Sequence, residues 1–99
     1  METLAVRVIS RKVIREFGKK HSDAGASLNA WYRIVKAADW KAPAELLRDV
    51  RGADVVGDKV VFNIAENKYR LIAFVKYPAR IVYIKAILTH KEYDKERWK

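Results

Sequence analysis

Five residues in the second half of the chain have side chains suited to act on a phosphate ester. Arg70 and Lys85 are cations that can bind an anion, and Asn63 can form hydrogen bonds. Histidine titrates near neutral pH, so His90 can carry a proton in either direction, and Tyr93 follows it by three residues. Together these residue types predict a polyanionic ligand such as nucleic acid, with acid–base chemistry beside it.

The cations also have structural interpretations. Arg70 can clamp a phosphate through two parallel hydrogen bonds, or it can form a surface ion pair with Glu66 or Glu92. Lys85 lies among apolar strand residues and can simply extend its ammonium group into water. Three further lysines are expected to add general attraction for an anion: Lys68, Lys91 and Lys95.

The two residues after the last predicted strand remain open as well. His90 can be presented at the edge of a sheet, or it can fill the first turn of a short helix capped by Thr89. Tyr93 can stack on a base or cover the end of the sheet as a core residue. In a helix the two side chains would share a face.

A β-hairpin is predicted to position these residues. Runs 69–77 and 80–88 are rich in β-branched and aromatic residues, and Pro78 favours a turn between them. If Tyr77 lies opposite Arg80, counting outward gives two faces. The apolar face, assigned to the core, contains Leu71, Ala73, Val75, Val82, Ile84 and Ala86. The other face, assigned to the working surface, contains Arg70, Ile72, Phe74, Tyr83, Lys85 and Ile87.

A third strand over 59–64 is predicted to join this hairpin through the turn 65–68. If Ile64 pairs with Tyr69, Phe62 lies opposite Leu71 in the core. Asn63 then lies beside Arg70, so polar groups from three adjacent strands meet on one face.

The first half of the chain predicts a strand and helices. A short strand over 4–9 is followed by Ser10 at the N-cap of a helix that ends near Lys20. A second helix begins after Ser22 or Asp23, and a helical segment over 44–50 follows. His21, in the link, is expected to have a surface or capping role. One apolar stripe of the second helix is formed by Leu28, Trp31, Tyr32 and Val35.

This order of elements predicts an α+β fold in which an N-terminal strand and a helical hairpin pack on one face of a twisted antiparallel sheet. A short C-terminal helix completes the fold. Trp40 and Trp98 could each be core, but exposure of either would point to a partner interface.

Composition limits the possible classes of protein. The formal net charge is +9, and 51% of the residues are hydrophobic, which predicts one basic folded domain over residues 1–99. There is no cysteine, so disulfide scaffolds and thiolate zinc sites are excluded. We expect no metal, no cofactor and no membrane partner, and a cytoplasmic location, because motifs for them are missing.

Four segments resemble the HigB family of bacterial toxins, within the wider RelE-like group. They are Val60–Ile64, Asn67–Ala73, Val82–Lys85 and Leu88–Asp94. The resemblance implies a metal-independent endoribonuclease that cleaves mRNA on the ribosome and inhibits translation. It also implies a partner antitoxin of the HigA type, with a helix-turn-helix domain.

The resemblance suggests a role for each candidate residue. Arg70 and Lys85 would bind the scissile phosphate, His90 would act as general acid or base, and Tyr93 would stack on a base or assist proton transfer. Asn63 would orient a base or phosphate. The alternative function is a basic module that binds RNA or an acidic protein without catalysis.

Overall fold

The structure is a computed structural model and describes residues 6–95 and 98. The strands are β1 (Arg7–Ile9), β2 (Asp54–Val56), β3 (Lys59–Ile64), β4 (Tyr69–Lys76) and β5 (Ile81–Thr89). The helices are α1 (Arg11–Lys20), a 3-10 turn η1 (Ser22–Ala24), α2 (Gly25–Ala37), α3 (Pro43–Asp49) and α4 (His90–Asp94).

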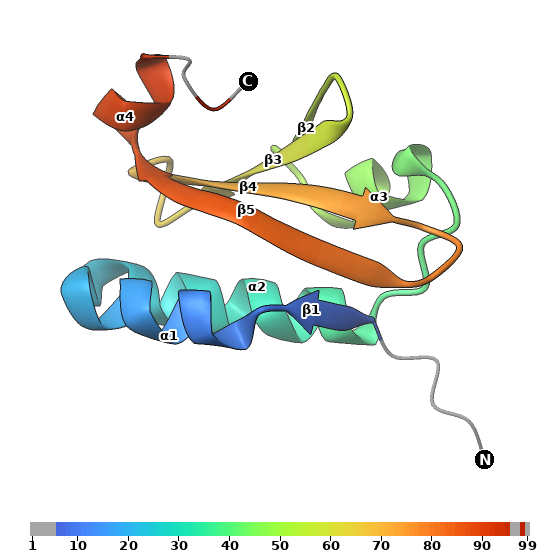
Figure 1. The fold of residues 1–99 in the computed structure, drawn as a ribbon, viewed down its shortest axis with the longest axis horizontal. Coiled ribbons are helices and arrows are strands. Elements are labelled where there is room, and N and C mark those ends of the chain that lie inside the picture. The colour runs from blue at the N-terminus through green and yellow to red at the C-terminus, as the bar shows by residue number, and fades with distance from the viewer. Residues whose placement is uncertain (1–5, 96–97, 99) are drawn as a thin grey trace.

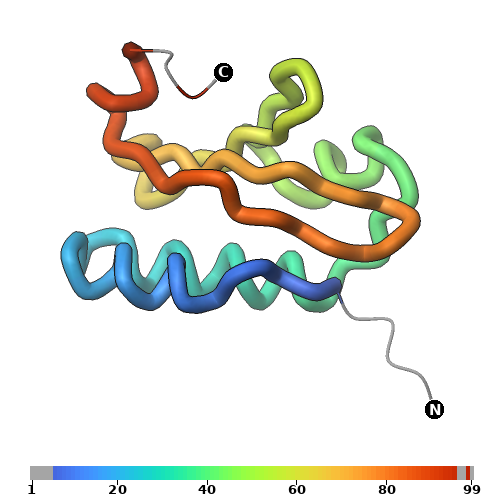
Figure 2. Tube along the Cα trace, viewed as in Figure 1, coloured from blue at the N-terminus to red at the C-terminus, as the bar shows by residue number. Residues whose placement is uncertain are grey.

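The strands form one five-stranded sheet in the order β1-β5-β4-β3-β2. All neighbouring pairs are antiparallel except β1 and β5, which are parallel, so the sheet is mixed. Figure 1 shows α1 and α2 side by side along one face, while α4 rises on the other side from the end of β5. The tube in Figure 2 shows the chain passing directly from β5 into α4. The predicted α+β fold is confirmed, except that the N-terminal strand, predicted to pack on one face of an antiparallel sheet, is an edge strand of the sheet itself and is parallel to β5.

The core lies between α2 and the sheet. Leu28, Trp31 and Val35 are buried on one stripe of α2, as the apolar spacing predicted. Tyr32, predicted in the same stripe, is only partly buried and packs against the edge of the core. The ring of Trp31 meets the ring of Phe62 edge to face, with 5.4 Å between centroids. Trp40 also belongs to the core, so it offers no exposed surface to a partner.

The predicted register of β3 and β4 is confirmed. Ile64 pairs with Tyr69, and Asn63 pairs with Arg70. The turn between these strands carries three non-glycine residues with positive φ, namely Ala65, Glu66 and Asn67.

The predicted turn between β4 and β5 is confirmed too. The backbone N–H of Arg80 donates to the carbonyl of Tyr77 over 3.2 Å. Both predicted hairpins of the sheet therefore exist, and their turns begin where the sequence indicated.

The predicted faces of β5 are wrong beyond its centre. Ala73 pairs with Ile84, but the next residue of β4, Ile72, pairs with Ala86, so Lys85 is an extra residue at a β-bulge. Ala86 was predicted in the core but lies opposite Ile72, on the face assigned to the working surface. Ile87 was predicted on the working face but lies opposite Leu71 and is buried in the core. One inserted residue reverses the alternation of every later side chain.

Two further expectations need correction. Ser10 precedes α1 as predicted, but its side chain forms no capping hydrogen bond; instead its backbone carbonyl accepts from the N–H of Val13 over 3.2 Å. The second helix begins with the 3-10 turn at Ser22, which leads into α2. Of the predicted first strand, Leu4 and Ala5 lie outside the described residues.

The sheet face opposite α1 and α2 is apolar at its centre and polar at its edges. Val61 and Ile72 pair across β3 and β4, and both are buried although neither belongs to the main core cluster. We call this surface, which carries Arg70, Phe74, Tyr83, Lys85 and Leu88, the open face. Among the helices of the described part of the chain, none has the length and apolar character needed to cross a membrane.

Candidate nucleic-acid interface

Arg70 is held in place by the backbone around it. Its Nη1 atom donates to the carbonyl of Asn67 over 2.6 Å and lies 3.4 Å from the carbonyl of Tyr69. Within residues 6–95 and 98, no ion pair joins Arg70 to Glu66 or Glu92, so the anticipated surface pairs are not formed. The guanidinium is thus positioned by neutral backbone groups, and no carboxylate of the described residues forms an ion pair with it.

The aromatic ring of Tyr93 lies next to this cation. The Arg70 guanidinium carbon is 5.3 Å from the centre of the Tyr93 ring, within the range of a cation–π interaction. Trp98 is stacked on the same ring, with 4.8 Å between centroids and 14° between planes. The indole Nε1 donates to the Tyr93 carbonyl over 2.9 Å. Arg70 on β4, Tyr93 on α4 and Trp98 beyond the end of α4 are thus in successive contact, and we call these three side chains the column.

His90 begins α4 and is exposed, with 58% of its side chain accessible. Thr89 is the N-cap: its hydroxyl accepts from the N–H of Glu92, and the Glu92 carboxylate accepts from the N–H of Thr89. This capping box fixes the start of the helix. The predicted alternative, that His90 fills the first turn of a capped helix, describes its position correctly.

The imidazole of His90 has one polar partner among the described residues. Its Nδ1 atom is 3.0 Å from a carboxylate oxygen of Asp94, one turn along α4. When Nδ1 carries a hydrogen, it can donate a hydrogen bond to the Asp94 carboxylate, which leaves Nε2 facing away from that contact and able to meet a ligand. The geometry therefore suits a general acid or base as well as a surface ion pair.

Lys85 is exposed at the bulge of β5, on the open face. Its Nζ atom is 5.8 Å from the centre of the Tyr83 ring, and Tyr83 in turn lies opposite Phe74. Lys85 also lines a hollow together with Lys59 and Trp98. Because Trp98 stacks on Tyr93, this hollow adjoins the column that contains Arg70.

Asn63 is on the open face beside Arg70, but its side chain already has a structural partner. Its Nδ2 atom donates to the carbonyl of Gly52 over 2.9 Å. Gly52 has φ +84°, a conformation that glycine tolerates best. The amide thus ties the loop before β2 to β3, and its oxygen is the part left to meet a ligand.

The three lysines expected to attract anions differ in their surroundings. Lys68 forms an ion pair with Asp23 over 3.5 Å, on the side of the helical hairpin. Lys91 is exposed on α4. Lys95 lines a second hollow with Leu88, Glu92 and Trp98. Only Lys95 of these three is placed beside the aromatic column in the described residues.

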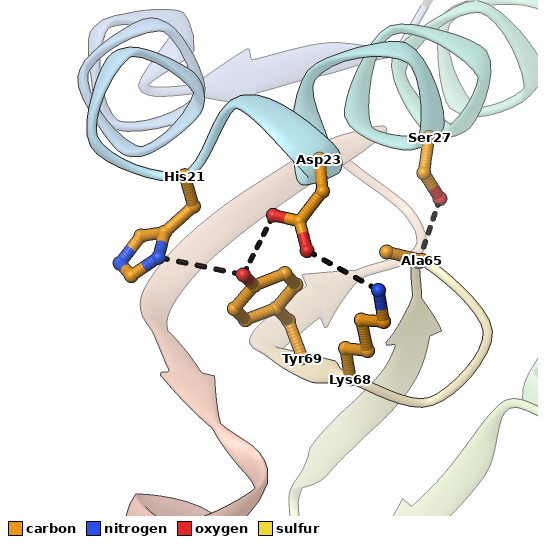
Figure 3. A network of polar contacts seen from close by, with 6 residues as sticks. All are labelled: His21, Asp23, Ser27, Ala65, Lys68 and Tyr69. Atoms are coloured by element: carbon orange, nitrogen blue, oxygen red, sulfur yellow. Dashed lines mark hydrogen bonds and ion pairs between the residues drawn. The ribbon is translucent and has the colours of Figure 1, made fainter.

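A polar network joins the helical hairpin to the start of β4 (Figure 3). The Tyr69 hydroxyl donates to Asp23 over 2.7 Å and lies 3.4 Å from Nδ1 of His21, and Asp23 also meets Lys68. The ring of His21 stacks on Phe17. His21 therefore has the structural role expected of it, and it also supplies the C-cap N–H of α1.

This network shifts the proton affinities of its members. The hydrogen bond from Tyr69 is the largest cause that lowers the pKa of Asp23, and the ion pair with Lys68 adds to it. The same hydrogen bond, followed by burial, raises the pKa of Tyr69. Asp23 is thus held ionised and Tyr69 neutral, which suits a structural tie at the base of the sheet.

Sequence reasoning missed the stacking partner of Tyr93 and the wall of the hollow. Trp98 was left undecided between core and interface, and Phe74 was seen only as part of a face. The five-residue spacing from Tyr93 to Trp98 is not a helical stacking interval, so no periodic signal could have found the contact. The repeated interleaving of aromatic and cationic residues over 69–98 was the available signal.

Comparison with known proteins identifies similar chains. Residues 24–96 match the family described as HigB_toxin, the RelE-like toxic component of a toxin-antitoxin system. The chain is 26% identical over 93 residues to the mRNA interferase HigB of Escherichia coli O6:H1 (strain CFT073), covering 91% of this chain and 90% of the relative. It is 26% identical over 92 residues to the mRNA interferase toxin HigB of Escherichia coli (strain K12), covering 90% and 88%.

Proposed function

Because this chain belongs to the HigB family of RelE-like toxins of toxin–antitoxin systems, we propose that it is an endoribonuclease that cleaves mRNA and inhibits translation. The observation that carries this proposal is the column of Arg70, Tyr93 and Trp98 beside exposed His90. It combines an anion-binding cation, rings for stacking and a proton carrier. The names of the similar E. coli proteins, mRNA interferases, support the same activity.

In the proposed reaction the RNA supplies its own nucleophile. The 2′-hydroxyl attacks the adjacent phosphorus, the bond from phosphorus to the 5′-oxygen breaks, and a cyclic phosphate and a 5′-hydroxyl end result. Arg70 and Lys85 stabilise the negative charge that grows on the phosphate oxygens. His90, whose Nδ1 faces Asp94, donates a proton to the departing 5′-oxygen or accepts one from the 2′-hydroxyl, and water exchanges the other of these two protons.

The remaining groups hold the substrate in position. The oxygen of the Asn63 amide can accept a hydrogen bond from a base while its nitrogen stays on Gly52. The ring of Tyr93 contacts both the guanidinium of Arg70 and the indole of Trp98. Lys95 and Lys91 add positive charge around α4, which attracts the phosphate backbone.

Four finer points belong to the proposal. Cleavage proceeds without a metal ion, since Arg70 and Lys85 can bear the phosphate charge that a metal bears in other nucleases. The substrate is mRNA on the ribosome, which would orient the RNA for attack by its own 2′-hydroxyl. The antitoxin that pairs with this toxin is a helix-turn-helix protein of the HigA type. The toxin acts in the cytoplasm.

The test is expression in bacteria, with the ends of the mRNAs mapped. We expect arrested growth and new mRNA ends from the native chain, and neither from His90→Ala. Lys41→Ala, an exposed change outside the candidate interface, should cut as the native chain does. Intact transcripts with unimpaired growth, or RNA retarded on a gel but left whole, would favour a module that binds without cutting.

Assays with purified protein test ribosome dependence and metal independence separately from the endoribonuclease activity itself. Cleavage of free mRNA should be slow and should increase when ribosomes are added, and a chelator such as EDTA should leave the rate unchanged. Loss of activity with EDTA and recovery with Mg²⁺ would reject metal independence while leaving the endoribonuclease proposal in place.

A further inference from the structure

Trp98 lines two neighbouring hollows on the open face. One hollow, of about 520 Å³, is lined by Asp58, Lys59, Phe74, Lys85 and Trp98. The other, of about 400 Å³, is lined by Ala86, Leu88, Glu92, Lys95 and Trp98. Both volumes are within the range of small-molecule sites. A planar group entering either hollow would meet the indole of Trp98.

The position of the indole is determined by its neighbours. It stacks nearly parallel on the Tyr93 ring, and its Nε1 donates to the carbonyl of Tyr93 over 2.9 Å. The guanidinium of Arg70 in turn lies over the Tyr93 ring. Trp98 therefore extends the column that begins with the cation proposed to bind the scissile phosphate.

The two hollows differ in charge. Among the described residues that line the hollow with Phe74, Lys59 and Lys85 carry positive charge, and the carboxylate of Asp58 is paired with Lys59 over 3.1 Å. The hollow beside Leu88 has one lysine, Lys95, and the carboxylate of Glu92. An anionic strand is therefore attracted more strongly to the hollow with Phe74.

We infer that Trp98 and Phe74 form a base-binding subsite, which receives a nucleobase of single-stranded RNA next to the phosphate held by Arg70. This inference rests on the proposed function and names a contact that determines substrate binding. Base stacking on aromatic side chains is tolerant of sequence, while cations such as Lys59 and Lys85 follow the phosphates. An aromatic wall with a basic edge meets both requirements.

Intrinsic fluorescence can test the inference directly, because the chain has three tryptophans and two of them are shielded. Trp31 and Trp40 are each 4% exposed, whereas Trp98 is half-buried at the hollow. The ligand is a single-stranded 2′-O-methyl oligonucleotide of about ten nucleotides, within the usual span of such sites. It lacks the attacking 2′-hydroxyl, so binding is measured without cleavage.

We expect the oligonucleotide to quench the emission of the native chain, and Trp98→Phe to lose that change. In fluorescence anisotropy, Trp98→Ala should bind about five- to a hundredfold more weakly, and Phe74→Leu should also be weakened. Trp98→Phe, which keeps a ring, should stay close to native affinity. Tyr32→Ala is the matched control: Tyr32 also lies under an arginine, Arg11, but on the helical layer, and its loss should leave affinity unchanged.

An abasic oligonucleotide provides the decisive arm. Each base of the oligonucleotide is replaced in turn by an abasic site. At the position whose base enters the subsite, we expect the native chain and Trp98→Ala to bind equally, because the contact between base and indole is then absent in both complexes. Circular dichroism checks that each variant is folded. Native affinity in folded Trp98→Ala, or unchanged emission of the native chain at saturation, would overturn the subsite. Neither readout depends on cleavage, so failure of the endoribonuclease proposal is seen separately.

Discussion

The guanidinium of Arg70 lies over the ring of Tyr93, with 5.3 Å between the guanidinium carbon and the ring centre. The contact joins the middle strand of the sheet to the short helix that carries His90. A cation–π contact leaves the guanidinium N–H groups in the plane of the cation, from which they can still donate to an anion. The contact therefore links the cation that we propose to bind the scissile phosphate to the helix that carries His90, the proposed proton carrier.

Replacement of Arg70 should impair cleavage more than folding. Arg70→Ala removes the cation that we propose to stabilise the transition state, and we expect RNA cleavage to fall by about 100- to 1,000-fold. Arg70→Lys keeps the charge but loses the planar fork, so its activity should be intermediate. Initial rates of cleavage measure both effects. Arg33→Ala, an exposed arginine on α2, is the control, and equal rates for Arg70→Ala and the native chain would exclude Arg70 from the site.

Replacement of His90 should remove proton transfer. We expect His90→Ala to lower the cleavage rate by about 100- to 10,000-fold while the melting temperature is little changed, because the side chain is largely exposed. His90→Gln, which can form a hydrogen bond but not carry the proton, should be equally impaired. A His90→Gln variant that retains half of the native rate would argue for a surface ion pair alone.

The Asn63 amide is predicted to contribute to stability through Gly52. Asn63→Ala removes the hydrogen bond to the Gly52 carbonyl and should lower the free energy of unfolding by about 1 kcal/mol. Gly52→Ala should also destabilise, because a Cβ there would be 3.0 Å from Nδ2 of Asn63 on a backbone with positive φ. Urea denaturation measures both changes. A native midpoint for both variants would show that this tie has no part in stability.

Stability should fall in acid because of the Asp23–Tyr69 hydrogen bond. The pKa of Asp23 is lowered in the folded chain from its ordinary value of 3.8, so below that pH the unfolded chain takes up the proton first. The stabilisation from this carboxylate is complete above pH 3.8 and is lost as the pH falls through its lower folded pKa. Thermal denaturation in acid should show a shallower decline for Tyr69→Phe, which lacks the main cause of the shift. Tyr32→Phe should decline as the native chain does.

At alkaline pH the stability of the fold depends on pH in the opposite direction. The pKa of Tyr69 is raised in the folded chain from its ordinary value of 10.0 by the hydrogen bond to Asp23 and by burial. Above pH 10.0 the unfolded chain loses the phenolic proton first, so stability declines as the pH rises toward the folded pKa. Tyr69→Phe should remove this share of the alkaline decline. Identical pH profiles for Tyr69→Phe and the native chain would mean that the hydrogen bond adds nothing to stability.

Local patterns were sufficient to predict most elements and one strand register. β-branched runs, turn residues and the apolar stripe of α2 act over a few residues, so the sequence indicates them directly. The pairing of Asn63 with Arg70 follows from a short turn and simple alternation, and the structure has it. The resemblance to HigB toxins also depended on sequence segments alone.

The tertiary structure decided what those patterns could not express. The bulge at Lys85 reverses the faces of Ala86 and Ile87, because the pairing with β4, and not the order of residues in β5, sets where the alternation breaks.

Contacts between distant segments were equally hidden. Arg70 on β4 meets Tyr93 on α4, and Asp23 meets Tyr69 across the junction of the helical hairpin with the sheet. The sequence by itself determined which side chains were available for chemistry and the local elements that carry them. Only the packing of helices and strands decided which of them touch, since that depends on how the whole chain buries its apolar surface.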